Sequence, residues 1–133
     1  MLLTRVEYVK RAGKTFVIVD GGMSELIRPS HYGGYHGIER VDARNPRDVE
    51  PVDVVGPVCE TGDFLARDRA MEVPEAGELL AVRTAGAYGF AMASNYNGRR
   101  RPAECMVDGD RVTLIRRRET FEDLVRGEED VQT

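Results

Sequence analysis

The chain has 133 residues, the usual length of one domain, and 41% hydrophobic with 32% charged residues is the composition of an ordinary globular protein. A net charge of −4 provides no overall positive field for nucleic acid or an anionic membrane. No apolar run approaches the roughly 18 residues of a spanning helix, and the N-terminus lacks a signal-peptide pattern. We therefore expect a cytoplasmic protein that binds neither nucleic acid nor membrane.

Short strands dominate the first half of the predicted structure. Residues 3–10 alternate with a period of two, and residues 15–20 form a β-branched and aromatic run, which together predict a hairpin. Residues 21–37 contain five glycines and a proline, which predicts an irregular loop. Further strands are predicted at residues 38–43, 52–58, 78–85, 103–107 and 111–117.

The second half adds few helices. Residues 120–126 are predicted as a helix with Thr120 as its N-cap, whereas residues 88–96 fit either a strand or one or two helical turns. Residues 128–133 are expected to be a frayed polar terminus. Many short strands without a strand-helix-strand rhythm predict a mainly β fold. It would be a β-sandwich or a Greek-key-like β-barrel with a few short helices.

Cysteine, lysine and arginine usage limits the chemistry. Cys59 and Cys105 lack the spacing and histidine neighbours of a zinc site, so each is interpreted as an individual thiol and no metal is expected. Lys10 and Lys14 are the only lysines among 19 basic residues. The arginine triplets at residues 99–101 and 116–118 suggest a phosphate site, but we favour solvated side chains in an acidic protein.

One candidate site lies in the glycine-rich stretch 20–32. Arg28 and Tyr32 are four residues apart and would share one face of a helix. A guanidinium can hold a carboxylate with two hydrogen bonds, and a phenol can add another. The alternative is a surface arginine paired with a nearby acid, which the spacing alone favours.

Two further stretches carry candidate chemistry. In residues 56–63, the Cys59 thiol is a possible proton donor, and the adjacent Glu60 carboxylate is a possible amine-binding group. In residues 86–98, small residues surround Tyr88, whose hydroxyl could contact a phosphate. The alternatives are a buried structural cysteine, an exposed turn glutamate and simple core packing.

In this order, the three stretches resemble the C-terminal domain of the diaminopimelate decarboxylases, pyridoxal phosphate enzymes of the alanine racemase and ornithine decarboxylase fold type. The matching motifs are D-G-G-M…L-I-R-P-x-x-Y, C-E-T-G-D, and G-A-Y-G-F-x-M-x-S-N-Y-N followed by R-P. The family usually has alanine at Gly21, asparagine-aspartate at Ser24 and Glu25, and serine at Thr61. The resemblance covers nearly the whole chain.

The resemblance implies a role for each matching residue. Arg28 would take the distal carboxylate of the substrate, and Tyr32 would also bind substrate. Cys59 would donate a proton, and Glu60 would contact the distal amino group. Tyr88 would contact both cofactor and substrate. The Cys59–Glu60 pair would reach into the active site of a second subunit, so the resemblance implies a homodimer with shared sites.

The resemblance also implies a part that this sequence lacks. Relatives have an N-terminal (β/α)₈ barrel that supplies the cofactor-linking lysine and most of the pyridoxal 5'-phosphate site, and such a barrel takes about 250 residues. Neither Lys10 nor Lys14 lies in a matching motif. We therefore expect residues 1–133 to be a single C-terminal β-domain, inactive alone, whose partner is the barrel domain of the same enzyme.

The parent activity implied is conversion of meso-diaminopimelate to L-lysine and carbon dioxide. One alternative is a related decarboxylase of ornithine, arginine or carboxynorspermidine. Such substrates would leave Arg28 without a carboxylate, and the ornithine branch typically has aspartate where Glu60 stands. The other alternative is a non-catalytic dimerisation or binding module that has kept these residues.

Overall fold

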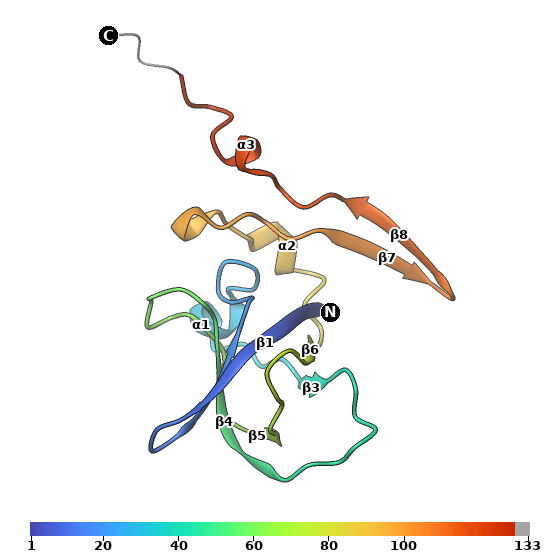
Figure 1. Ribbon diagram of the computed structural model, residues 1–133. Coiled ribbons are helices and arrows are strands. Elements are labelled where there is room, and N and C mark those ends of the chain that lie inside the picture. The colour runs from blue at the N-terminus through green and yellow to red at the C-terminus, as the bar shows by residue number, and fades with distance from the viewer. Residues whose placement is uncertain (130–133) are drawn as a thin grey trace. The chain divides into compact units, whose positions relative to one another are not determined.

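The computed structural model describes residues 1–129, which form two compact units that divide between Ala93 and Ser94 (Figure 1). The first unit contains β1 (Leu2–Arg11), β2 (Thr15–Val19), α1 (Arg28–Tyr32), β3 (Ile38–Arg40), β4 (Val49–Val55), β5 (Phe64–Glu72), β6 (Leu79–Val82) and α2 (Gly89–Met92). The second contains the 3-10 turn η1 (Tyr96–Gly98), β7 (Glu104–Asp108), β8 (Arg111–Arg116) and α3 (Phe121–Leu124). Within the described residues, no helix is long and apolar enough to cross a membrane.

The mainly β prediction is confirmed, and every predicted strand is present with ends that differ by at most three residues. β5 is not among the predicted strands. Its alternation of buried and exposed residues breaks at Arg67 and Asp68, where a bulge against β4 places Asp68 in the left-handed region at φ 48°. A strand interrupted in this way does not show a period of two in its sequence.

The helix predictions have mixed outcomes. Thr120 is the N-cap of α3, and its backbone N–H donates to the Asp123 carboxylate at 2.8 Å, so the predicted helix is confirmed. Residues 88–96 take the helical alternative through α2. The irregular loop predicted over residues 21–37 is partly wrong, because its glycines flank α1 instead of interrupting it. Of the frayed terminus predicted over residues 128–133, residues 130–133 lie outside the described part of the chain.

The first unit is built on one six-stranded sheet of order β3-β6-β1-β2-β4-β5. All neighbouring pairs are antiparallel except β2 and β4, which run parallel with Val17 opposite Val54. The connection between these two strands contains α1 and β3. In the second unit, β7 and β8 form an antiparallel hairpin around Asp108-Gly109-Asp110, a sequence typical of hairpin turns.

The two edges of the six-stranded sheet meet, which gives the unit a nearly closed, barrel-like form. Arg40 of β3 has a buried side chain that forms an ion pair with Glu72 of β5 at 2.9 Å and with Glu78 at 3.3 Å. Burial opposes ionisation of Glu78, but a hydrogen bond from the Glu75 N–H and the guanidinium groups of Arg47 and Arg40 outweigh it and lower the pKa of Glu78. The apolar core lies inside the curved sheet, with Val6, Val17, Val19, Leu26, Val52, Val54, Leu65, Leu80 and Val82 almost fully buried.

We predict that Arg40→Met lowers the thermal unfolding midpoint by about 5 to 10 °C, because it leaves two carboxylates without their shared cation at the closure of the sheet. Arg44→Met is the matched control. Arg44 pairs with Asp42 on the surface, and losing such a pair should shift the midpoint by less than about 2 °C. Equal shifts in the two variants, measured by circular dichroism, would show that the Arg40 cluster does not stabilise closure.

Candidate functional site

Helix α1 places Arg28 and Tyr32 on one face. Pro29 fixes the first turn, and Gly33 ends the helix in the left-handed conformation at φ 63°, which glycine adopts without a steric penalty. Because the helix spans these five residues, the conditional expectation that Arg28 and Tyr32 share a face is confirmed. Tyr32 is exposed, and its ring packs edge-to-face on His31.

Tyr88, 60 residues further along the sequence, lies against Arg28. The Arg28 Cζ is 5.4 Å from the centre of the Tyr88 ring, which is the range of a cation–π contact. Among residues 1–129, no carboxylate forms an ion pair with Arg28. The alternative of an arginine paired with a nearby acid is therefore not met in the described structure.

His36 is a member of this cluster to which the sequence pattern assigned no role. It is completely buried, and its Nδ1 lies 2.9 Å from the Arg83 carbonyl oxygen. A carbonyl can only accept, so Nδ1 carries the proton, and a guanidinium can only donate, so Nε2 is the acceptor in the contact with Arg28. Arg28 Nη1 approaches that nitrogen at 3.5 Å. A lone histidine in a glycine-rich loop has no sequence pattern that would reveal such a contact.

Cys59 and Glu60 lie on the turn that joins β4 to β5, and both are exposed. The turn is shaped by its own backbone, since the Glu60 N–H donates to the Val58 carbonyl at 2.8 Å and the Asp63 N–H donates to the Glu60 carbonyl at 3.0 Å. It lies beside α1, because a Cβ added at Gly62 would be 3.8 Å from that of Ser30. The exposed thiol excludes the alternative of a buried structural cysteine.

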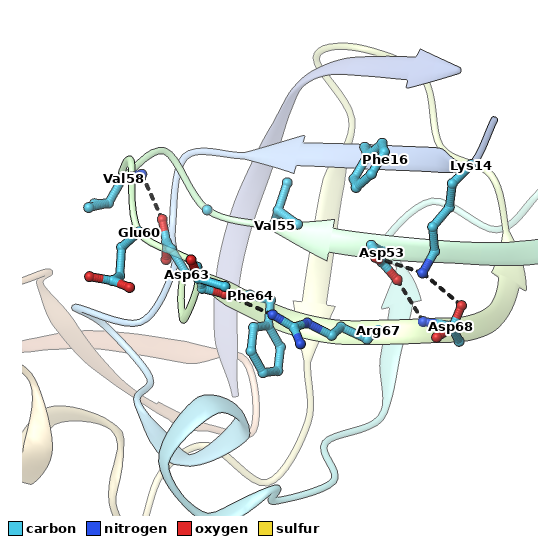
Figure 2. A pocket seen from close by; sticks show the side chains of 12 residues that line it. Lys14, Phe16, Asp53, Val55, Val58, Glu60, Asp63, Phe64, Arg67 and Asp68 are labelled. Carbon is cyan, nitrogen blue, oxygen red and sulfur yellow. Dashed lines mark hydrogen bonds and ion pairs between the residues drawn. The ribbon is translucent and has the colours of Figure 1, made fainter. Parts of the chain in front are cut away.

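A buried carboxylate joins this turn to the glycine-rich loop that leads into α1. Asp63 accepts a hydrogen bond from the Met23 N–H at 2.7 Å. It accepts another from the Val58 N–H at 2.6 Å (Figure 2). Gly22 and Gly56 allow its approach, since a Cβ at either position would lie 2.1 Å or 2.4 Å from an Asp63 oxygen. The two motifs that carry Arg28 and Cys59 are therefore fixed to one another.

An open cavity of about 510 Å³ extends from this turn along the outer side of β4 and β5, with Glu60 at one end and Lys14 at the other (Figure 2). Lys14 Nζ lies 2.8 Å from Asp53 and 2.7 Å from Asp68, and these carboxylates raise the pKa of Lys14. A lysine held as an ammonium ion in two ion pairs is a poor nucleophile. Within residues 1–129, no group of three or more His, Cys, Asp or Glu side chains is arranged to hold a metal.

We predict that Gly22→Ala and Gly56→Ala each destabilise the protein by about 1 to 3 kcal/mol, because the new methyl group would overlap the Asp63 carboxylate. Gly86→Ala is the control, since a Cβ there meets no atom within 4 Å. Urea unfolding would measure the difference. If all three variants unfold at the same urea concentration, close packing around Asp63 does not constrain these glycines.

The sequence of this chain is similar to a known domain family and to curated proteins. The family model of the pyridoxal-dependent decarboxylase C-terminal sheet domain matches residues 1–86. The diaminopimelate decarboxylase of Pseudomonas aeruginosa is 54% identical over 131 residues, which are 96% of this chain and 31% of that protein. This chain therefore spans about a third of the length of the curated relatives it matches.

Solved structures show the same fold. The diaminopimelate decarboxylase from Helicobacter pylori complexed with L-lysine aligns with a TM-score of 0.85 and 43% identity, covering 94% of this chain and 30% of that one. A lysine decarboxylase from Selenomonas ruminantium aligns with a TM-score of 0.63 at 24% identity over 74% of this chain and 26% of that one, a likeness of fold alone.

Proposed function

The chain belongs to the pyridoxal-dependent decarboxylases, whose C-terminal sheet domain it contains, and we propose that it serves a diaminopimelate decarboxylase. That enzyme converts meso-diaminopimelate to L-lysine and carbon dioxide in the cytoplasm. Residues 1–133 would be its C-terminal β-domain, and a (β/α)₈ barrel domain of the same enzyme would be its partner. We further propose a homodimer in which the exposed Cys59–Glu60 turn of one subunit enters the site of the other.

One observation carries the choice of substrate. Arg28 is a half-buried cation with no acid partner among the described residues. The Tyr88 ring lies against it, and Tyr32 is on the same face of α1. A substrate with a carboxylate at its far end would supply the missing anion through a charge-assisted hydrogen bond. Diaminopimelate has such a carboxylate, whereas the decarboxylation substrates ornithine and arginine do not. Their decarboxylases remain the alternative enzymes that the site favours less.

Pyridoxal 5'-phosphate fits this site only in part. The exposed Tyr88 can present its hydroxyl to the cofactor or substrate, but neither lysine of the chain belongs to the Arg28 cluster, and Lys14 is held by Asp53 and Asp68. The barrel domain would therefore hold most of the cofactor. When bound, pyridoxal phosphate withdraws electrons from the α-carbon of the substrate, which permits the bond to the departing carboxylate to break.

The residues of this chain would bind the substrate and deliver a proton. Arg28 and Tyr32 would orient the distal carboxylate, and Glu60 would accept hydrogen bonds from the distal ammonium group. Once carbon dioxide leaves, the electron pair of the broken bond remains at the α-carbon and takes the proton from Cys59 Sγ. The resulting thiolate regains a proton from solvent. An exposed turn suits these roles because it can enter a second subunit.

We predict that Arg28→Ala in the full-length enzyme weakens L-lysine binding by about 10- to 100-fold, or about 1.5 to 3 kcal/mol, as expected for a lost charge-assisted hydrogen bond. Loss of one carboxylate from diaminopimelate leaves lysine with the distal carboxylate intact, whereas cadaverine lacks it. Calorimetry should therefore show that cadaverine binding is unchanged. An unaltered lysine affinity would contradict the carboxylate role and favour the alternative decarboxylases.

We predict that Cys59→Ala in the full-length enzyme slows turnover by about 10²- to 10⁴-fold, the usual contribution of a positioned acid, without weakening lysine binding. Cys105→Ala is the matched control, because Cys105 is also an exposed thiol but lies on β7. Wild-type turnover in the Cys59 variant would show that Cys59 is not the proton donor. Full-length enzyme that binds lysine but makes none from diaminopimelate would support the other alternative, a non-catalytic module.

A further inference from the structure

We propose that His36 is a positioning residue that orients the Arg28 guanidinium toward the distal carboxylate of the substrate. The inference rests on the proposed function, because it concerns the binding site for that carboxylate. It begins from a side chain that is completely buried and lies next to the cation of the site. A buried imidazole with both nitrogens in polar contacts has a defined orientation and a defined tautomer.

The ring of His36 is held from the side opposite Arg28. Its Nδ1–H donates to the Arg83 carbonyl at 2.9 Å, and the Thr84 hydroxyl donates to the same oxygen at 2.8 Å. Thr84 adopts φ 54°, a left-handed conformation that is unfavourable for a β-branched residue. This strained residue directly follows Arg83, so the surrounding structure maintains an unfavourable backbone at the point where the carbonyl meets His36.

The backbone of His36 is fixed as well. Arg69 of β5 donates to the His36 carbonyl at 2.6 Å, and its guanidinium lies 4.1 Å from the centre of the Tyr35 ring. β5 is a strand of the main sheet, so the loop segment that carries His36 is attached to the rigid part of the unit. Nε2 is therefore presented to Arg28 from a position defined by both the backbone and the ring.

The chemistry of the contact explains why an imidazole serves better than a carboxylate. Nε2 accepts a hydrogen bond without carrying a charge, and the face of the Tyr88 ring attracts a cation without neutralising it. The two neighbours of Arg28 thus restrict its side chain but leave its full positive charge available. A carboxylate in the place of Nε2 would also hold the guanidinium, but its negative charge would compete with the substrate.

Two amide substitutions in the full-length enzyme test the proposal. His36→Asn retains a donor for the Arg83 carbonyl but is too short to place an acceptor near Arg28. We expect it to weaken L-lysine binding by about tenfold, the scale of one hydrogen bond, with unchanged cadaverine binding and little change in kcat. His36→Gln extends an acceptor further toward Arg28 and should restore lysine affinity to within about threefold of the wild type.

A double-mutant cycle separates this proposal from the proposed function. In the Arg28→Ala background, His36→Asn should cause no further loss of lysine affinity, because the two residues act through one contact. If Arg28→Ala weakens lysine binding but His36→Asn does not, or if His36→Asn weakens lysine and cadaverine equally, the positioning role is wrong while the function stands. If Arg28→Ala itself has no effect, the proposed function fails.

Nitrogen NMR of the full-length enzyme provides a readout that does not depend on activity. His36 should show a protonated Nδ1 and an unprotonated Nε2, and Arg28→Ala should shift mainly the Nε2 resonance. A protonated Nε2 in the wild-type protein would overturn the proposal, because that nitrogen could not then accept from Arg28.

Discussion

One buried carboxylate fixes the arrangement of the two loops that carry the candidate residues. Asp63 accepts backbone hydrogen bonds from the loop that leads into α1 and from the turn that carries Cys59. Each loop has backbone hydrogen bonds of its own, and the Asp63 carboxylate, which accepts from both, fixes the position of one loop relative to the other. Gly22 and Gly56 belong to the same interaction, since they leave the space that the carboxylate occupies.

The arginines that form ion pairs within the fold differ in their partners from the arginine proposed to bind substrate. Arg40, Arg47 and Arg101 each pair with glutamates, as expected in a protein with more acids than bases. Arg28 contacts an imidazole and a phenol ring instead. A cation that the fold has already restrained loses less side-chain entropy when a ligand binds, so more of the ion-pair energy contributes to affinity.

The sequence predicts most of the strands and the residues of the candidate site, but not how the site is held together. A period-two pattern identifies β1, and a β-branched and aromatic run identifies β2. β5 is not predicted, because a bulge interrupts its alternation of buried and exposed residues. The short helix α1 is not predicted, because the glycines on either side of it indicate a loop. Asp63 and His36 each also contact a residue 40 or more positions away, Met23 and Arg83 respectively, a relationship that only the folded chain reveals.

The parallel pairing of β2 with β4 links folding to assembly of the site. The segment between these strands contains α1, Arg28 and His36, so it is both the crossover of the sheet and the carrier of the binding residues. Closing so long a connection has an entropic cost that is recovered only when non-local contacts form. Two sets of non-local contacts offset that cost. The β2–β4 contacts align the two strands, and the Asp63 hydrogen bonds fix the crossover segment to the turn between β4 and β5. Because Arg28 and His36 lie in this crossover, a chain in which β2 and β4 paired out of register would misplace both residues.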